Sequence, residues 1–315
     1  MPSRFEYNTA EMPPLTHSER SMNFEQTIRA SPKILMEAAI VERVRRAHPD
    51  LLHRRLASSL LVLSSEGRGI LSGFVREYIS IARDAGLPIV LGSPSWRVDK
   101  VRCAEENITV DLNREAVQFS QGFKQEYSDL YIAGQIGCRN DCYQPAEALS
   151  TTEAFDFHSW QIERLVGADF LYGVTLPEIH EALGIAQAMA ATERPYIISF
   201  VIGKDGRILD GTSLERAIEK IDSATQRPPV GYGVNCCYPA FLRASALSGH
   251  AAERMISIQA NASSLTHAEL EAAETVQTDP VEDWSQCMLE LERTTGIKML
   301  GGCCGTTGEH LKALV

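Results

Sequence analysis

Eight short apolar segments, each separated from the next by a longer amphipathic stretch, constrain the fold of this 315-residue chain most strongly. Most of them are rich in Ile, Val and Leu and apolar on both faces, which is typical of parallel strands buried on both sides. We predict strands at residues 33–37, 88–92, 130–136, 169–174, 196–201, 230–234, 254–259 and 297–301.

Helical patterns fill the gaps between these segments. In residues 178–191, apolar side chains recur every three or four positions, and Ser150 with Glu153 predicts a capping box that opens the next helix upstream. Eight strands that alternate with helices form either a closed barrel or a doubly wound sheet. We predict a single-domain α/β fold, a (β/α)8 TIM barrel over residues 32–315, preceded by an N-terminal arm, 1–31, with a short helix near 24–29.

Two glycine-rich stretches that contain adjacent cysteines, residues 231–237 and 301–307, favour the barrel. Adjacent cysteines on a regular strand would point to opposite faces, but flanking glycines let the backbone bend. In a barrel, the carboxyl ends of all strands share one rim, so Cys236, Cys303 and Cys304 are expected to converge there. Three protein ligands and one open position are typical of catalytic zinc.

A Cys-Cys pair alone is more often two small buried hydrophobic residues than a metal site, so the zinc prediction depends on the combination of strand ends. Zinc held by three thiolates would bind a substrate thiol and deprotonate it. That chemistry suits attack on an electrophilic methyl group better than hydrolysis, for which histidine and carboxylate ligands are usual.

The segments Gly-Val-Asn-Cys at 233–236 and Gly-Gly-Cys-Cys-Gly-Thr-Thr at 301–307 resemble the two signature motifs of the homocysteine S-methyltransferase family. The resemblance extends over most of the chain after residue 33. It implies a (β/α)8 barrel whose zinc ligands are Cys236, Cys303 and Cys304. It also implies transfer of a methyl group from a sulfonium donor, S-methylmethionine or S-adenosylmethionine, to zinc-bound homocysteine, giving methionine.

Five residues at predicted strand ends are expected to bind substrate: Glu37, Trp96, Thr175, Asn235 and Asn261. Asn235 lies within the first motif, and Asn261 falls where the family carries an asparagine after its seventh strand. Trp96 could stack on a sulfonium donor through a cation–π contact, or could be a rim residue without a ligand.

The chain departs from the family pattern at two places. Glu37-Ala38-Ala39 replaces Asp-Gly-Gly, and Val174 stands where the family has a glutamate before a threonine. In the family these two acids hold the substrate ammonium, which needs a negative partner when it is partly buried. Either another acid such as Glu178 replaces the missing glutamate, or the acceptor is a different thiol, or the barrel binds zinc or a ligand without turnover.

The composition of the chain also argues against other classes of partner and location. The net charge of −11 argues against a nucleic-acid or anionic-membrane partner. No signal peptide is visible, and no apolar run approaches the roughly 18 residues of a membrane span, so we expect a cytoplasmic protein. A homo-oligomer is compatible with the sequence.

In the cytoplasm, the remaining cysteines are expected to be reduced. We expect Cys138 and Cys142 to be loop thiols or a second metal or redox pair, and Cys237 to be a core residue. His158 is expected to be structural.

Overall fold

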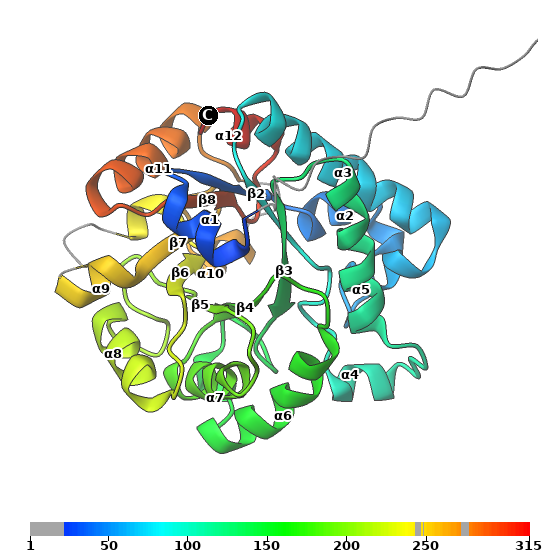
Figure 1. The fold of residues 1–315 in the computed structure, drawn as a ribbon, viewed down its shortest axis with the longest axis horizontal. Helices are drawn as coiled ribbons and strands as arrows, with labels where there is room; N and C mark the ends of the chain where they lie inside the picture. The colour runs from blue at the N-terminus through cyan, green and yellow to red at the C-terminus, as the bar shows by residue number, and fades with distance from the viewer. Residues whose placement is uncertain (1–21, 243–246, 248, 272–276) are drawn as a thin grey trace, which may run out of the picture.

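The computed structural model describes residues 22–242, 247, 249–271 and 277–315, whose strands close into one parallel barrel in chain order (Figure 1). The strands are β1 Ile34–Met36, β2 Ile89–Gly92, β3 Leu130–Ile136, β4 Phe170–Leu176, β5 Tyr196–Phe200, β6 Gly231–Asn235, β7 Met255–Ala260 and β8 Met299–Gly302. The barrel closes where β1 pairs with β8, with Ile34 opposite Met299. The predicted (β/α)8 fold is confirmed, and each predicted strand lies within two residues of the observed one at either end.

Most of the helices surround this barrel on the outside, and α1, Phe24–Ala30, lies over one of its ends (Figure 1). The helices follow in chain order. They are α1 Phe24–Ala30, α2 Val41–Ala47, α3 Ser65–Asp84, α4 Lys100–Glu105, α5 Leu112–Gln121, α6 Thr151–Arg164, α7 Ile179–Ala190, α8 Leu214–Ala224, α9 Gly249–Arg254, α10 His267–Glu271, α11 Val281–Thr295 and α12 Gly308–Lys312. The capping box predicted from the sequence opens α6: the Ser150 side chain accepts from the Glu153 backbone, and the Glu153 side chain accepts from the Ser150 backbone.

The strands are buried on both faces because two separate apolar cores flank them. One core fills the barrel interior and includes Phe170, Tyr172 and Val174 of β4. The other lies between the strands and the surrounding helices. This double burial explains why most strand positions are apolar and why the strands lack a regular alternation with polar residues.

Helix α1 covers the amino-terminal end of the barrel, where Figure 1 shows it lying across the strands. The Phe24 ring stacks on Phe170 with centroids 3.8 Å apart, and the Thr27 hydroxyl is 2.5 Å from that of Tyr131. The short helix predicted near residues 24–29 is therefore present. Residues 1–21 of the predicted arm lie outside the described residues, and the boundary at residue 31 stays a prediction.

The opposite, carboxyl-terminal end of the barrel opens into a cavity of about 900 Å³. Barrels of this type carry their binding residues at that end, on the loops that follow the strands. Among the helices that the structure describes, none is both long enough and apolar enough to cross a membrane.

Candidate metal and substrate site

The three cysteines predicted as zinc ligands come together at the cavity floor. The sulfur atoms of Cys236 and Cys303 are 2.6 Å apart, and the Cys304 thiol forms hydrogen bonds with both. All three residues line the cavity. The predicted convergence of β6 and β8 at one rim therefore occurs, although the two strands are not neighbours.

Strand β7, which lies between β6 and β8, sets the alignment of these cysteines. The backbone N–H of Cys236 donates to the carbonyl of Gln259 at 3.1 Å, and that of Cys303 donates to the carbonyl of Ala260 at 2.8 Å. The N–H of Cys304 donates to the side-chain oxygen of Asn261 at 3.2 Å. Gln259, Ala260 and Asn261, at the end of β7, thus each accept a hydrogen bond from the backbone of one cysteine.

Asn235 holds the ends of three strands together. Its side-chain oxygen accepts from the Thr175 backbone at 2.9 Å and from the Ser199 hydroxyl at 2.7 Å, and its amide nitrogen is 3.3 Å from the Cys236 sulfur. Thr175 and Cys236 both have positive φ angles, 55° and 54°. Such backbone strain in residues other than glycine persists only where surrounding contacts enforce it, and it clusters at functional sites.

Asn235 and Asn261, both predicted to bind substrate, thus use their side chains to position the cysteines. Both residues line the cavity. Their contact with a substrate stays a prediction, as does that of Thr175.

The charge of the cluster is concentrated on Cys304. Hydrogen bonds donated by Cys236 and Cys303 lower the pKa of the Cys304 thiol well below its usual range, and the positive charges of Arg45 and His267 add to this effect. The hydrogen bonds that Cys236 donates to Cys303 and Cys304 raise its own pKa. The three thiols therefore titrate as one acid–base unit, in which Cys304 loses its proton most readily.

Three converging thiols fit zinc by donor chemistry, since thiolates are among its preferred ligands. Within the described part of the chain, however, no group of three or more His, Cys, Asp or Glu side chains has the spacing of a ready metal site. Two thiolates on one tetrahedral zinc lie roughly 3.8 Å apart, given Zn–S bonds of about 2.3 Å. The sulfurs of Cys236 and Cys303, 2.6 Å apart, would have to separate to share the ion.

Glu37 is the acid that remains of the pair expected in the family. It lines the cavity and is 8% exposed, and its Oε2 atom has no hydrogen-bond partner among the described residues. Burial raises the pKa of this carboxyl to about 8, although a hydrogen bond from the Gly92 backbone opposes the shift. At neutral pH, Glu37 is therefore mostly protonated until a cation enters the cavity.

We expect Glu37 to make the folded protein less stable as pH rises. Its pKa is about 8 in the folded state against an ordinary value of 4.5, so the folded state binds more protons throughout that window. The free energy of unfolding should fall by about 1.4 kcal/mol per pH unit from this group, or about 2 kcal/mol between pH 5 and pH 6.5.

Urea unfolding of Glu37→Gln measures this contribution, because the variant removes the titrating group and keeps the shape. The difference in stability between variant and wild type should grow with pH. The exposed Glu219→Gln, on α8, serves as the matched control. A constant difference between pH 5 and pH 8 would show that the Glu37 carboxyl ionises normally.

Trp96 contacts the protein on its edge and on one face. Its indole N–H donates to the Thr175 hydroxyl at 2.7 Å, and the guanidinium of Arg97 lies 4.5 Å from the ring centroid. A cation already occupies that face, which lowers its value as a platform for a sulfonium. The structure therefore favours the interpretation of Trp96 as a rim residue that positions Thr175.

Val174 lines the cavity directly before Thr175, and Ala38 and Ala39 line it beside Glu37. The alternative that Glu178 takes the place of the missing acid receives no support. Its side chain caps α7 by accepting from the backbones of His180 and Glu181, and it is not among the described residues that line the cavity.

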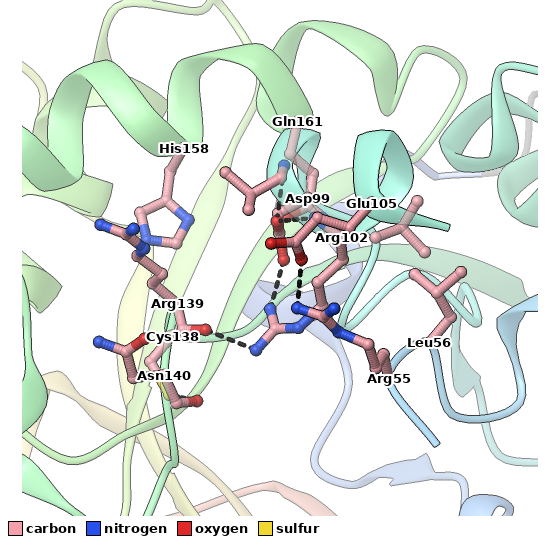
Figure 2. Close-up of polar contacts among 12 residues, drawn as sticks. Arg55, Leu56, Asp99, Arg102, Glu105, Cys138, Arg139, Asn140, His158 and Gln161 are labelled. Atoms are coloured by element: carbon pink, nitrogen blue, oxygen red, sulfur yellow. Dashed lines mark hydrogen bonds and ion pairs between the residues drawn. The ribbon is translucent and has the colours of Figure 1, made fainter. Parts of the chain in front are cut away.

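A loop over residues 137–149 carries Cys138, Cys142 and Tyr143 over one side of the cavity. Figure 2 shows how this loop is anchored: Arg102 bridges Asp99 and the carbonyl of Arg139, at 2.5 Å from the latter. Both cysteines are buried free thiols. Burial raises the pKa of both thiols, and their expected role as loop thiols stays a prediction.

Two further expectations concern residues beside the site. His158 is 1% exposed and its Nε2 atom is 3.0 Å from the carboxylate of Glu181, which also accepts from the backbones of Arg139 and Leu149. Its role is structural, as expected. Cys237 is 2% exposed and belongs to the core outside the barrel, also as expected.

Several residues that line the cavity were given no role at the site by the sequence analysis. The ring of Tyr143 stacks on His267 with centroids 3.4 Å apart, although 124 positions separate the two in the chain. Gln135 and Glu37 both lie so close to Gly92 that a side chain there would collide with them. Three arginines also line the cavity: Arg45, Arg54 and Arg97. Nothing local in the sequence distinguishes these residues from ordinary surface positions.

Comparison with known proteins places this geometry in a family. A model of the family described as homocysteine S-methyltransferase matches residues 36–315. The metallated form of the homocysteine methyltransferase MmuM from Escherichia coli has a TM-score of 0.71 at 18% identity, with 92% of this chain and 97% of that chain covered. Its oxidized form has a TM-score of 0.68 at 19% identity, with coverages of 91% and 96%. At such identities these structures support the fold alone. No curated protein matches the sequence.

Proposed function

Because the chain belongs to the homocysteine S-methyltransferase family, we propose that it transfers a methyl group from a sulfonium donor to a thiol bound at its three cysteines. The chain is a methyltransferase by this membership. The finer proposal adds zinc on Cys236, Cys303 and Cys304, S-methylmethionine or S-adenosylmethionine as donor, and homocysteine as the family's acceptor. The observation that carries it is the convergence of three thiols on one side of a large cavity.

Zinc, when bound by these thiolates, would bind the substrate thiol and lower its pKa, so that the sulfur is ionised at neutral pH. The protein's own residues perform the rest. Gln259, Ala260 and Asn261 hold the cysteine backbones in register, and Asn235 donates toward the Cys236 sulfur. Such outer contacts orient ligands and strengthen metal binding.

The reaction itself is a displacement at the methyl carbon. A bond forms between the acceptor sulfur and the methyl carbon while the bond from that carbon to the sulfonium sulfur breaks. The electron pair of the broken bond stays on the departing thioether, and the thiol proton is released to solvent. The cavity contributes proximity and alignment of the two sulfur atoms, which accounts for much of the acceleration in reactions of this kind.

Metal removal tests the proposal. We expect the purified protein to hold one zinc per chain by elemental analysis and to form methionine from homocysteine and S-methylmethionine. Removing zinc with a chelator should abolish turnover, and adding zinc back should restore it. Equal turnover with and without zinc would contradict the proposal. Stoichiometric zinc without turnover of any thiol, with either donor, would support the non-catalytic alternative.

A second candidate keeps the chemistry and changes the acceptor. Val174 leaves the cavity without the fourth-strand acid that the family uses to hold an ammonium, and Glu37 is mostly protonated at neutral pH. The groups available to bind the remote end of the acceptor therefore differ from those expected for an amino acid.

A further inference from the structure

The cavity above the cysteines is lined by three arginines that have no acidic partner in the part of the chain that the structure describes. Arg45 lies on α2, Arg54 follows in the next loop, and Arg97 lies in the segment after β2. Among the described residues, none of the three side chains forms an ion pair or a hydrogen bond, and the guanidinium of Arg97 lies over the Trp96 ring. Arg45 and Arg54 are exposed toward solvent, and Arg97 is half-buried.

The acids of the same cavity do not neutralise these arginines. Glu42 is already engaged, since its carboxylate pairs with Arg46 and accepts from the backbone of Gly305. Glu37 is mostly uncharged at neutral pH. Asp141 remains, and it accepts a hydrogen bond from the Tyr143 backbone. Arg45 also faces the Cys304 thiol, whose pKa it helps to lower. Among the described residues that line the cavity, Asp141 is thus the remaining free carboxylate beside three arginines.

Unpaired guanidinium groups around a partly closed cavity favour one class of ligand. The planar guanidinium donates two parallel hydrogen bonds to a carboxylate or a similar oxyanion. An ammonium in the same space would be repelled by the arginines and would lack an ionised partner. Val174, at the cavity wall, has an apolar side chain without a charge or a hydrogen-bond acceptor for such an ammonium.

We propose that the preferred acceptor is an acidic thiol, with an oxyanion at its remote end and no ammonium group. The proposal depends on the function proposed above, because it assigns the thiol that the cysteines hold. The sulfur of this acceptor lies at the cysteines, and its oxyanion lies against Arg45 or Arg97 near the cavity wall.

Three thiols of matched length separate the two recognition groups. Homocysteine carries a carboxylate and an ammonium, 4-mercaptobutyrate lacks only the ammonium, and 3-mercaptopropylamine lacks only the carboxylate. With zinc-loaded protein and S-methylmethionine, kcat/KM should be at least tenfold higher for 4-mercaptobutyrate than for homocysteine, and lowest for 3-mercaptopropylamine. Calorimetric titration should give the same order of Kd without any turnover.

Variants then identify the residues. Arg45→Gln and Arg97→Gln should each weaken 4-mercaptobutyrate binding about tenfold, by the usual strength of a hydrogen bond to a charged group. They should leave 3-mercaptopropylamine binding unchanged or slightly stronger. Arg293→Gln is the matched control, since it removes an exposed arginine that pairs with Glu290 on α11. This variant should change the binding of neither thiol.

The outcomes distinguish this inference from the proposed function. Methylation of homocysteine at least as fast as 4-mercaptobutyrate, with no effect of the arginine variants, overturns the inference and leaves the function standing. Absence of turnover with all three thiols, together with 4-mercaptobutyrate binding that the arginine variants weaken, supports the inference and overturns the function. If 4-mercaptobutyrate binds no more tightly than 3-mercaptopropylamine, the arginines do not select the acceptor.

Discussion

Cys303→Ala should lose its zinc and lower kcat/KM for methyl transfer by about a thousandfold. Zinc sites of four ligands bind with about 10–16 kcal/mol, so one thiolate contributes on the order of 4 kcal/mol, which corresponds to roughly three orders of magnitude in affinity. The effect is large here because Cys303 contacts both of the other proposed ligands, Cys236 and Cys304. Elemental analysis after dialysis measures the metal, and steady-state assays measure the turnover.

Cys237→Ala is the matched control, since it also removes one thiol beside the site. Its side chain is buried in the core outside the barrel and belongs to no metal-ligand group among the described residues. This variant should keep one zinc per chain and near wild-type turnover, with a small loss of stability from the cavity it leaves. Unchanged zinc content in Cys303→Ala would show that the ligand assignment is wrong.

Val174→Glu should raise kcat/KM with homocysteine on the order of a hundredfold. The substitution restores a carboxylate at the cavity wall, next to Thr175, where the family carries a glutamate. An ammonium left without a partner in a partly closed cavity costs a few kcal/mol, and each 1.4 kcal/mol is about tenfold in binding. The same carboxylate should repel 4-mercaptobutyrate, so the order of the two thiols should reverse.

Val174→Gln separates charge from size in this experiment. It has the same shape as the glutamate variant without its charge, and it should give little or no gain with homocysteine. Ala38 and Ala39 line the same cavity, and hydrogen bonds with the Thr306 and Tyr78 hydroxyls hold the Ala39 backbone. High homocysteine turnover in the wild type, without improvement in Val174→Glu, would mean that another residue holds the ammonium.

Local sequence patterns were sufficient to predict the barrel fold. Strand burial on both faces favours apolar residues at most positions, and helix starts favour caps such as Ser150, so both leave a signal within a few residues. The cysteine motifs were equally readable, because Cys236 and Cys303 follow strand ends and all strand ends of a barrel share one rim. Family membership through these motifs is confirmed over residues 36–315.

Charge and hydrogen-bond partnership in the cavity were decided by the tertiary structure alone. Whether Arg45 is neutralised depends on where Glu42 points, and the pKa of Glu37 depends on burial beneath residues far along the chain. In the same way, the guanidinium of Arg97 lies over one face of the Trp96 ring. The sequence determined which elements form and where the thiols gather, because those properties follow from short-range pattern. The tertiary structure decided which charges remain unpaired above them, because pairing depends on distances between residues that no local pattern encodes.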